Sequence, residues 1–571
     1  MTAFTEYETD VLVIGGGLAA LRAALSARAT GARVLVVVKR KLGKSGSSAI
    51  TSGGFAAACS DLNPADDAFQ HYSDTVVGGG LVNDRRLAQV LVDEAPERLR
   101  ELWDAGVKFQ TRDGNYYFSP SGDHRHPRVL VPKNVRGTDL TLPLLAAARA
   151  ADVEILENTL IVDLLVDDGR VTGAVGIHRN KVGGCVIRAG ATVLATGGAG
   201  RLFSVTSNPV DVTGGGYALL MRAGGMLRDM EFIQFYPWRL IRPFRSTRVP
   251  IQPSTFVSGA KLYNSRGERF MENYDPDKKE TATRDISARG IFDQIRLGLS
   301  VDGGVILDIS DVEDEQFRFE NRKVIDRLDP RGINYREIPL ILGPEAHFMM
   351  GGALVDEFGA TVLMNLFACG ETAGGLHGGN RINSNALPET QVFGHRAGVA
   401  AAETALRRKT GHIDEEIVSK WLFRLSKIRD KNTNVSSELR AILKTFREAM
   451  WLGLGIVRTA DGLRQALIEV TTTRMKVAAL STERLGDLIA HIELENLCDV
   501  ATASASSALL RTESRAAHYR DDFPTTDPAW LSTVVYGGGR ASVRPLQVEP
   551  DEELRLSAAP LQSTRSDEFV E

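Results

Sequence analysis

Three small residues near the start of the chain have the spacing of a phosphate-binding turn. Gly15, Gly17 and Ala20 form a G-x-G-x-x-A pattern directly after the apolar run 11–14. Glycine lets the backbone approach a pyrophosphate, and the helix that follows directs its free amide groups at the negative charge. With a helix expected over 18–27 and a second strand over 34–38, this pattern predicts a βαβ unit that binds a dinucleotide. Lys39 ends the second strand, where an acid often binds the ribose.

The composition narrows the classes of function. The 571 residues carry a net charge of −4, with 68 Lys and Arg against 72 Asp and Glu, so no basic field predicts nucleic-acid binding. The 55 glycines occur in clusters, which indicates backbone brought close to a ligand. The four cysteines form no CxxC pair, which argues against an iron–sulfur cluster or a structural zinc site within this chain.

The chain shows no sign of insertion into a membrane or of export. No apolar run near the start is long enough to span a bilayer, and the acidic N-terminus is unlike a basic export signal. We therefore expect a cytoplasmic protein with no transmembrane segment. His124 and His126 form an H-x-H pair without a nearby third ligand, so we expect a solvated loop and no metal there.

Two later segments complete the predicted nucleotide-binding domain. A strand meander over 154–177 leads to a strand ending in A-T-G-G at 195–198, a sequence typical of flavoproteins that place it against FAD. A short strand at 366–371 ends in an acid, Glu371. We therefore predict an α/β fold of the two-dinucleotide-binding type with a Rossmann-like FAD domain, an inserted capping domain and a C-terminal helical domain. The expected boundaries are 1–231 with 346–410 (FAD domain), 232–345 (capping and substrate domain), 411–535 (helical domain) and 536–571 (tail).

Motifs in the same order along nearly the whole chain resemble those of a known family. The run GLHGGNRINSNAL at 375–387, followed by VFG at 392–394, is similar to the HGANR…NSL…FG signature of the fumarate reductase, succinate dehydrogenase and L-aspartate oxidase flavoproteins. Five further segments resemble the same family: LRDMEFIQF at 227–235, RGERFM at 266–271, TRDI at 283–286, HFMMGG at 347–352 and ESRAAHYRDDFP at 513–524.

The resemblance implies a reaction and roles for individual residues. It implies an FAD-dependent oxidoreductase that interconverts C–C and C=C bonds beside a carboxylate, with a hydride exchanged at flavin N5 and a proton supplied by Arg284. Arg381 matches the arginine that clamps the substrate carboxylate, and His347 would bind the same substrate. The residues expected to contact the cofactor are Gly15, Gly17, Ala20, Lys39, Ser47, Ser48, Gly53, Gly54, Thr196, Gly197, Glu371, Asn385 and Leu387.

Departures from the family pattern concern the second end of the substrate. Tyr236 replaces the histidine of a Q-F-H-P-T run, and Gln252 and Pro253 fall where the family has a threonine–glutamate pair. Proline offers no side-chain hydrogen bond. We therefore expect a substrate other than plain fumarate or succinate, with a larger second end that contacts Tyr236, Trp238 and Gln252.

Another departure concerns the attachment of the cofactor. Ser47 occupies the position of the histidine that links FAD covalently in some members, so we expect non-covalent FAD. The triplet 214–216 lacks the aspartate of the family's T-G-D-G.

Several alternatives stay open. The loop R-I-N-S-N at 381–385 resembles the R-M-A-S-N of the L-aspartate oxidases more than the R-L-G-G-N of the dehydrogenases. An amino-acid oxidase is therefore one alternative. Another is a flavoprotein subunit of a complex with a separate iron–sulfur subunit, and a third is an electron-transfer subunit with a degraded site. In each case the chain needs a separate redox partner: O₂, a quinone, a nicotinamide or an iron–sulfur subunit.

Overall fold

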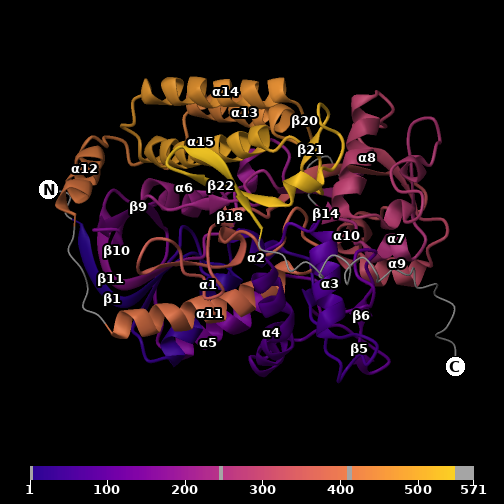
Figure 1. The fold of residues 1–571 in the computed structure, drawn as a ribbon, viewed down its shortest axis with the longest axis horizontal. Coiled ribbons are helices and arrows are strands. Elements are labelled where there is room, and N and C mark those ends of the chain that lie inside the picture. The colour runs from indigo at the N-terminus through magenta and orange to yellow at the C-terminus, as the bar shows by residue number, and fades with distance from the viewer. Residues whose placement is uncertain (1–3, 244–248, 408–413, 547–571) are drawn as a thin grey trace.

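The computed structural model describes residues 4–243, 249–407 and 414–546. Within these ranges the chain forms a central sheet, a second sheet with short helices at one end, and a layer of long helices (Figure 1). The predicted α/β architecture with a C-terminal helical region is confirmed.

A seven-stranded sheet forms the nucleotide-binding core. Its order is β8-β2-β1-β11-β10-β9, with β19 pairing with β11. β1 pairs in parallel with both β2 and β11, whereas β10 is antiparallel to β9 and β11. The carboxyl ends of the parallel strands β1, β11 and β19 therefore lie at the same edge of the sheet, where nucleotides bind in sheets of this kind. The strands are β1 (Thr5–Ile14), β2 (Val34–Val37), β8 (Glu154–Leu156), β9 (Thr159–Asp167), β10 (Arg170–His178), β11 (Gly184–Leu194) and β19 (Leu366–Ala368).

Both faces of this sheet are buried, which explains the continuous apolar runs in its strands. In β1, Val11 and Val13 pack in a cluster with the helices of one face, while Leu12 and Ile14 pack in a second cluster with the C-terminal helices. Figure 1 shows α11 and α5 running below the sheet. The helices of the first cluster are α1 (Leu18–Ala29), α3 (Ala68–Gly78), α4 (Arg85–Asp104), α5 (Thr138–Ala150) and α11 (Ala386–Leu406).

The segment between the two parts of the FAD domain builds a separate sheet with its own apolar core. Its strand order is β14-β13-β17-β16-β15, and short helices cover it. The expected boundary at 345/346 falls inside β17. The elements are β13 (Ile233–Arg242), β14 (Val249–Pro250), β15 (Lys261–Tyr263), β16 (Val305–Asp308), β17 (Leu340–Met349), α7 (Ser254–Val257), α8 (Arg284–Arg296), α9 (Asp314–Glu320) and α10 (Arg322–Leu328).

Four helices lie C-terminal to α11. They are α12 (Glu415–Ser426), α13 (Ser437–Gly453), α14 (Ala460–Ala478) and α15 (Leu485–Leu510). Three of them, α13, α14 and α15, stack together at the top of Figure 1. The start of the expected tail lies within strand β22 (Ser532–Gly537), which pairs with β23 (Arg540–Pro545) and with β12 (Leu227–Arg228). The rest of the expected tail, 547–571, lies outside the described residues.

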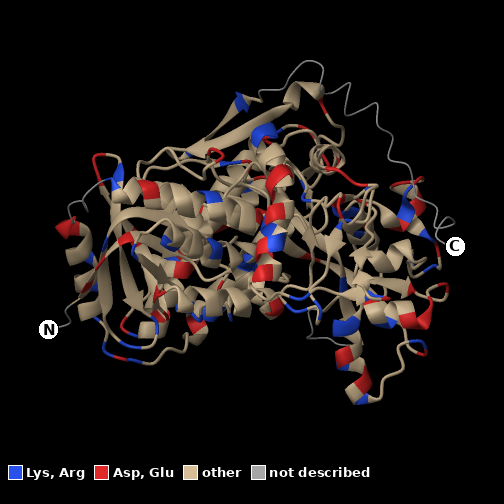
Figure 2. Ribbon diagram, turned by 90° about the horizontal axis from the view of Figure 1, so that it is seen from below, with Lys and Arg blue, Asp and Glu red and all other residues tan. Residues whose placement is uncertain are grey.

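Acidic and basic residues are interspersed on the elements that face the viewer in Figure 2. The four cysteines are buried and free. Within the described ranges, no three His, Cys, Asp or Glu side chains are placed to hold a metal ion. No helix in that part of the chain is both long and apolar enough to cross a membrane.

Candidate active site

A cavity of about 310 Å³ lies between the open edge of the central sheet and the second sheet. This volume is in the range of small-molecule and cofactor sites. The cavity is lined by most of the residues that the sequence placed at a site: Gly15, Gly17, Lys39, Ser47, Ser48, Gly53, Gly54, Thr196, Gly197, Tyr236, Gln252, Arg284, His347, Glu371, Arg381 and Leu387.

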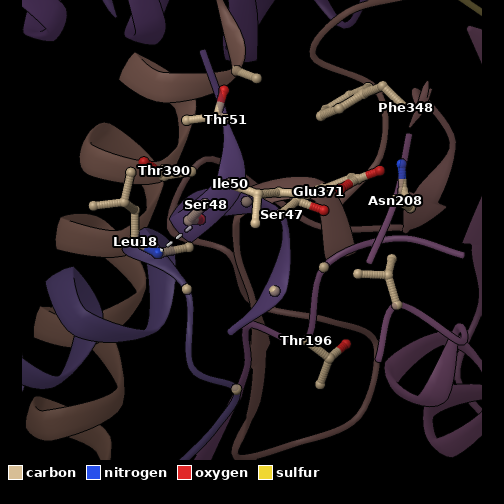
Figure 3. Close-up of a pocket in the computed structure, with 18 of the residues that line it drawn as sticks. Leu18, Ser47, Ser48, Ile50, Thr51, Thr196, Asn208, Phe348, Glu371 and Thr390 are labelled. Carbon is tan, nitrogen blue, oxygen red and sulfur yellow. Dashed lines mark hydrogen bonds between the residues drawn. The ribbon is translucent and has the colours of Figure 1, made fainter. Parts of the chain in front are cut away.

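The glycine turn after β1 has no room for side chains. Gly15 has a φ of +142°, and a Cβ there would lie 2.0 Å from the carbonyl oxygen of Ala195. Gly17 precedes α1 without a side-chain cap, and a Cβ on Gly17 would lie 2.8 Å from Ser48 Oγ. Ser48 Oγ accepts a hydrogen bond from the Leu18 amide at 3.1 Å (Figure 3). The turn thus brings bare backbone and a helix N-terminus to the cavity wall, which suits the pyrophosphate of a dinucleotide.

Side chains around this turn leave room and hydrogen-bonding capacity for a cofactor. Ser47 Oγ is buried and has no hydrogen-bond partner among the described residues. Lys39 is not a free cation, since its Nζ donates to Thr213 Oγ1 at 2.8 Å and pairs with Glu493 at 3.0 Å. Burial raises the pKa of Glu371 to about 7, although its carboxylate accepts the Met349 amide at 3.0 Å. The uncapped start of α1 and the Ser47 hydroxyl therefore supply hydrogen-bonding groups that fit FAD.

Two arginines come together at the buried part of the cavity. Arg284 is the first residue of α8, and Arg381 lies in the loop before α11. Gln234 on β13 joins them, because its Oε1 accepts from Arg381 at 2.8 Å and from Arg284 at 3.3 Å. Asn383 Oδ1 accepts a second bond from Arg284 at 2.6 Å. Gln234 and Asn383 lie in the segments 227–235 and 375–387 that resemble the family, but the sequence analysis assigned neither of them a role at the site.

No carboxylate lies within ion-pair distance of either guanidinium group in the part of the chain that the structure describes, although the buried Asp123 acts on both through space. Neither Arg284 nor Arg381 forms an ion pair with any described residue, and the Nε of each is buried without a hydrogen-bond partner there. Burial and the neighbouring Arg284 lower the pKa of Arg381 to about 9. Aromatic rings cover them instead: Tyr236 lies 5.2 Å from Arg284 and Phe348 lies 4.9 Å from Arg381, measured from guanidinium carbon to ring centre. Such a pair is suited to an anionic ligand.

His347 lines the same cavity as a neutral imidazole. Its Nδ1 lies 2.9 Å from Ser207 Oγ, and its ring centre lies 5.2 Å from that of Tyr236. Burial and the charges of Arg381 and Arg284 hold its pKa well below the usual range. This histidine can exchange hydrogen bonds with a ligand without adding charge.

Three residues expected at the site lie outside the cavity lining. Trp238 is two residues further along β13 than Tyr236 and packs in the core of the second sheet, with its ring centre 4.5 Å from that of Phe256. Asn385 uses its amide to bind His71 and Thr75, both at 2.9 Å. Ala20 packs inside α1 against the sheet. Each is held by neighbours that a linear motif does not reveal.

The expectation of a solvated loop at the H-x-H pair is wrong for His124. His124 is buried, with its Nε2 2.7 Å from the Asn383 carbonyl and its Nδ1 2.9 Å from Arg128. Asp123 accepts the Asn383 amide at 2.7 Å. This segment therefore supports Asn383, which in turn holds Arg284.

Comparisons with known proteins agree with this geometry. A family model for the FAD-binding domain matches residues 10–387, and one for the fumarate reductase flavoprotein C-terminal region matches residues 443–562. The chain is 37% identical over 535 residues to the first subunit of the fumarate reductase (CoM/CoB) of Methanothermobacter marburgensis, a match that covers 93% of this chain and 97% of that protein. It is 31% identical over 568 residues to an L-aspartate oxidase of Synechocystis, with 94% and 98% covered. A point variant of the flavoprotein chain of E. coli quinol fumarate reductase has a TM-score of 0.87 at 26% identity, with 96% and 98% covered.

Proposed function

Since the chain belongs to the FAD-dependent oxidoreductase family of the fumarate reductase, succinate dehydrogenase and L-aspartate oxidase flavoproteins, we propose that it interconverts C–C and C=C bonds beside a carboxylate. We further propose that its substrate is larger than fumarate or succinate. The observation that carries the proposed carboxylate substrate is the buried pair Arg284 and Arg381, which has no carboxylate within ion-pair distance in the described part of the chain.

FAD, when bound, supplies the exchange of two electrons and one hydrogen with the substrate carbon. The glycine turn at 15–17 and the start of α1 would hold its pyrophosphate, and Glu371 and Leu387 line the cavity farther along. Serine cannot form a histidyl bond to the flavin, so the hydroxyl of Ser47 supports non-covalent binding.

Arg381 is the residue that binds the substrate carboxylate. Its two terminal nitrogens each use one N–H, for the Ile382 carbonyl at 3.2 Å and for Gln234 at 2.8 Å, so one N–H on each is left for a ligand. A carboxylate here would also relieve the repulsion between the two buried guanidinium groups. This contact fixes the neighbouring carbons of the substrate beside the cofactor.

Arg284 supplies the proton to the adjacent carbon when C=C is reduced, and takes it back when C–C is oxidised. Gln234 and Asn383 accept hydrogen bonds from its two terminal nitrogens and so fix its orientation. A guanidinium is a weak acid in water, but a buried, positioned donor facing a strongly basic carbon provides general acid catalysis of about 10²–10⁴-fold.

The other end of the cavity argues against fumarate. The Tyr236 hydroxyl donates to the Ile251 carbonyl, so it is already engaged within the protein. Gln252 and Pro253 line the cavity, and the family resemblance implies a threonine and a glutamate at these two positions. Losing two hydrogen bonds to a charged group would cost about 3–6 kcal/mol, or about 10²–10⁴ in affinity.

An amino-acid oxidase is the second candidate. It is supported by the R-I-N-S-N loop at 381–385 and by the similarity to L-aspartate oxidases. Rapid reoxidation of the reduced protein by O₂ with release of peroxide would favour it. The similarity to one subunit of a fumarate reductase supports a third arrangement, in which this chain passes electrons to or from a separate protein.

An anaerobic reoxidation experiment tests the proposal. The purified yellow protein is reduced, mixed with fumarate or with longer unsaturated acids, and followed by flavin absorbance. We expect slow or no reoxidation by fumarate and fast reoxidation by at least one larger 2-enoic acid. Fast reoxidation by fumarate would contradict the argument from Tyr236 and Pro253. Failure of every unsaturated acid, with O₂ reacting fast, would support the oxidase instead.

A further inference from the structure

The mouth of the cavity carries a cation that the catalytic pair does not include. Lys323 on α10 lines the cavity together with Gln252 and with Ile50, which is 50% exposed. Arg284 and Arg381, in contrast, are 5% and 4% exposed. Because the Lys323 side chain is only partly buried and bonds to the exposed segment of Ile50, we place it at the mouth of the cavity.

We propose that Lys323, with Gln252, binds a second carboxylate, so that the substrate is a dicarboxylate with a longer chain than fumarate. This inference rests on the proposed function, because Arg381 must hold the first carboxylate. It places the second negative charge beside Lys323 and the Gln252 amide, since Pro253 has no side-chain donor and the Tyr236 hydroxyl already donates to the Ile251 carbonyl.

The contacts of Lys323 leave capacity for a ligand. Its Nζ donates to the carbonyls of Ile50 at 2.8 Å and Thr51 at 2.9 Å, which uses two of the three N–H bonds of an ammonium group. No described carboxylate lies within ion-pair distance of it. A half-buried ammonium with only neutral partners is stabilised by an incoming anion, because carbonyl groups do not cancel its charge.

The charges around Lys323 also favour an anion. Burial, followed by the nearby Arg136 and Arg327, lowers its pKa to about 8, and Asp139 opposes this effect. Arg136 lies 3.5 Å from Asp326, so part of its charge is compensated. At neutral pH the Lys323 ammonium group is therefore charged.

The structure joins the two proposed ligands into one unit. Asn321, just before α10, accepts the backbone amide of Gln252 at 3.0 Å with its Oδ1 and donates to Thr255 Oγ1 at 2.8 Å with its Nδ2. The loop of Gln252 and the helix of Lys323 are therefore fixed relative to each other. Glu345 is one of the acids that line the cavity, and Arg239 lies 3.6 Å from it, which compensates its charge.

An ammonium group suits this role for a geometric reason. It is a compact charge with rotatable donors on a flexible stem, so it can meet a carboxylate without the fixed orientation that a guanidinium requires. Arg381 then sets the position of the reacting carbons, and Lys323 selects among chain lengths.

The test compares ligands with one and two carboxylates on the FAD-loaded protein. Saturated dicarboxylates from malonate to pimelate, and monocarboxylates of matching length, are titrated while the flavin absorbance is recorded. We expect the wild-type protein to bind at least one dicarboxylate longer than succinate more tightly than the matching monocarboxylate. In Lys323→Gln this dicarboxylate should bind at least about tenfold more weakly, and monocarboxylates within about twofold of wild type. Lys323→Arg should keep most of the preference.

Lys261→Gln is the matched control. It removes the same charge from the same segment of the chain, but Lys261 pairs with Asp311 away from the cavity, so no ligand should be affected. Equal weakening of both ligand classes by Lys323→Gln would overturn the proposal and leave Lys323 as a structural tie to Ile50 and Thr51. A shift of the flavin potential without any change in ligand preference would also overturn it. If no carboxylate of either class perturbs the wild-type flavin, the proposed function itself fails.

Discussion

Replacing Arg381 by methionine should stabilise the substrate-free protein while removing its affinity for carboxylates. Burial and the neighbouring Arg284 lower the pKa of Arg381 from 12.5 to about 9. Each tenfold change in acidity corresponds to about 1.4 kcal/mol, so keeping this group charged at pH 7 costs of order 2–5 kcal/mol after allowance for relaxation. The cost is present in full below pH 9 and falls as the pH rises toward 12.5, because the folded state then releases the proton first.

Thermal unfolding measures this effect. With an unfolding entropy of about 2.1 cal/mol/K per residue, a gain of 2–5 kcal/mol raises the unfolding midpoint by about 2–4 °C. A carboxylate ligand at about 100 times its dissociation constant should add about 2.7 kcal/mol to wild type and nothing to Arg381→Met. Flavin content is measured in parallel, so that a change in cofactor occupancy is not mistaken for a change in stability.

Arg458 provides a control with the opposite expected sign. It is also buried, and burial lowers its pKa to about 10. However, it donates to the carbonyls of Gly455 at 2.9 Å and Glu231 at 2.6 Å, and lies 2.8 Å from His518 Nδ1. Arg458→Met leaves these three groups unpaired at about 1–3 kcal/mol each and should destabilise the protein. Arg381→Met leaves only the Ile382 carbonyl, which accepts from Arg381 at 3.2 Å, because Gln234 keeps its bond from Arg284. If Arg381→Met lowers stability as Arg458→Met does, or keeps carboxylate affinity within twofold, the reasoning is refuted.

Three further outcomes follow from the cofactor site. Gly15→Ala should yield protein without FAD, since its Cβ would lie 2.0 Å from the Ala195 carbonyl oxygen. Gly31→Ala is the control for backbone strain alone, because Gly31 has a φ of +98° and a Cβ there would meet no atom within 4 Å, so this variant should retain FAD. The absorbance ratio of flavin to protein measures both outcomes. Acid precipitation of the wild-type protein should release all the flavin into solution, whereas flavin retained in the pellet would contradict the inference from Ser47. Because the pKa of Glu371 rises to about 7 in the folded state, stability should fall by up to about 3 kcal/mol between pH 4.5 and pH 7, and denaturant titration of Glu371→Gln should show a smaller decline.

The nucleotide-binding half could be predicted from the sequence because its signals are local. The apolar run at 11–14, the glycines at 15–17 and the following helix are neighbours in the chain, and the geometry of strand, turn and helix requires those residue types at those positions. The long amphipathic helices after 414 are also local, since their period of about 3.6 residues is written in consecutive positions.

The family resemblance extended this to residues far apart in the chain. It identified Arg284, His347 and Arg381 as members of one site, and the structure places all three in the lining of the same cavity. It also assigned Trp238 and Asn385 to the site, and these two lie outside the lining. The difference arises because a motif gives positions in a sequence, whereas a side chain's neighbours depend on how the strand or helix is rotated and packed.

The sequence by itself thus determined the βαβ unit and the kind of cofactor, and it predicted the residue types of a carboxylate site. Only the tertiary structure decided that Gln234 joins Arg381 to Arg284 across 147 and 50 positions of chain, and that Lys323 reaches the backbone of Ile50 across 273 positions. A local pattern reports the backbone preferences of consecutive residues. Contacts between distant side chains depend on how separate sheets and helices pack together, and no local pattern encodes that packing.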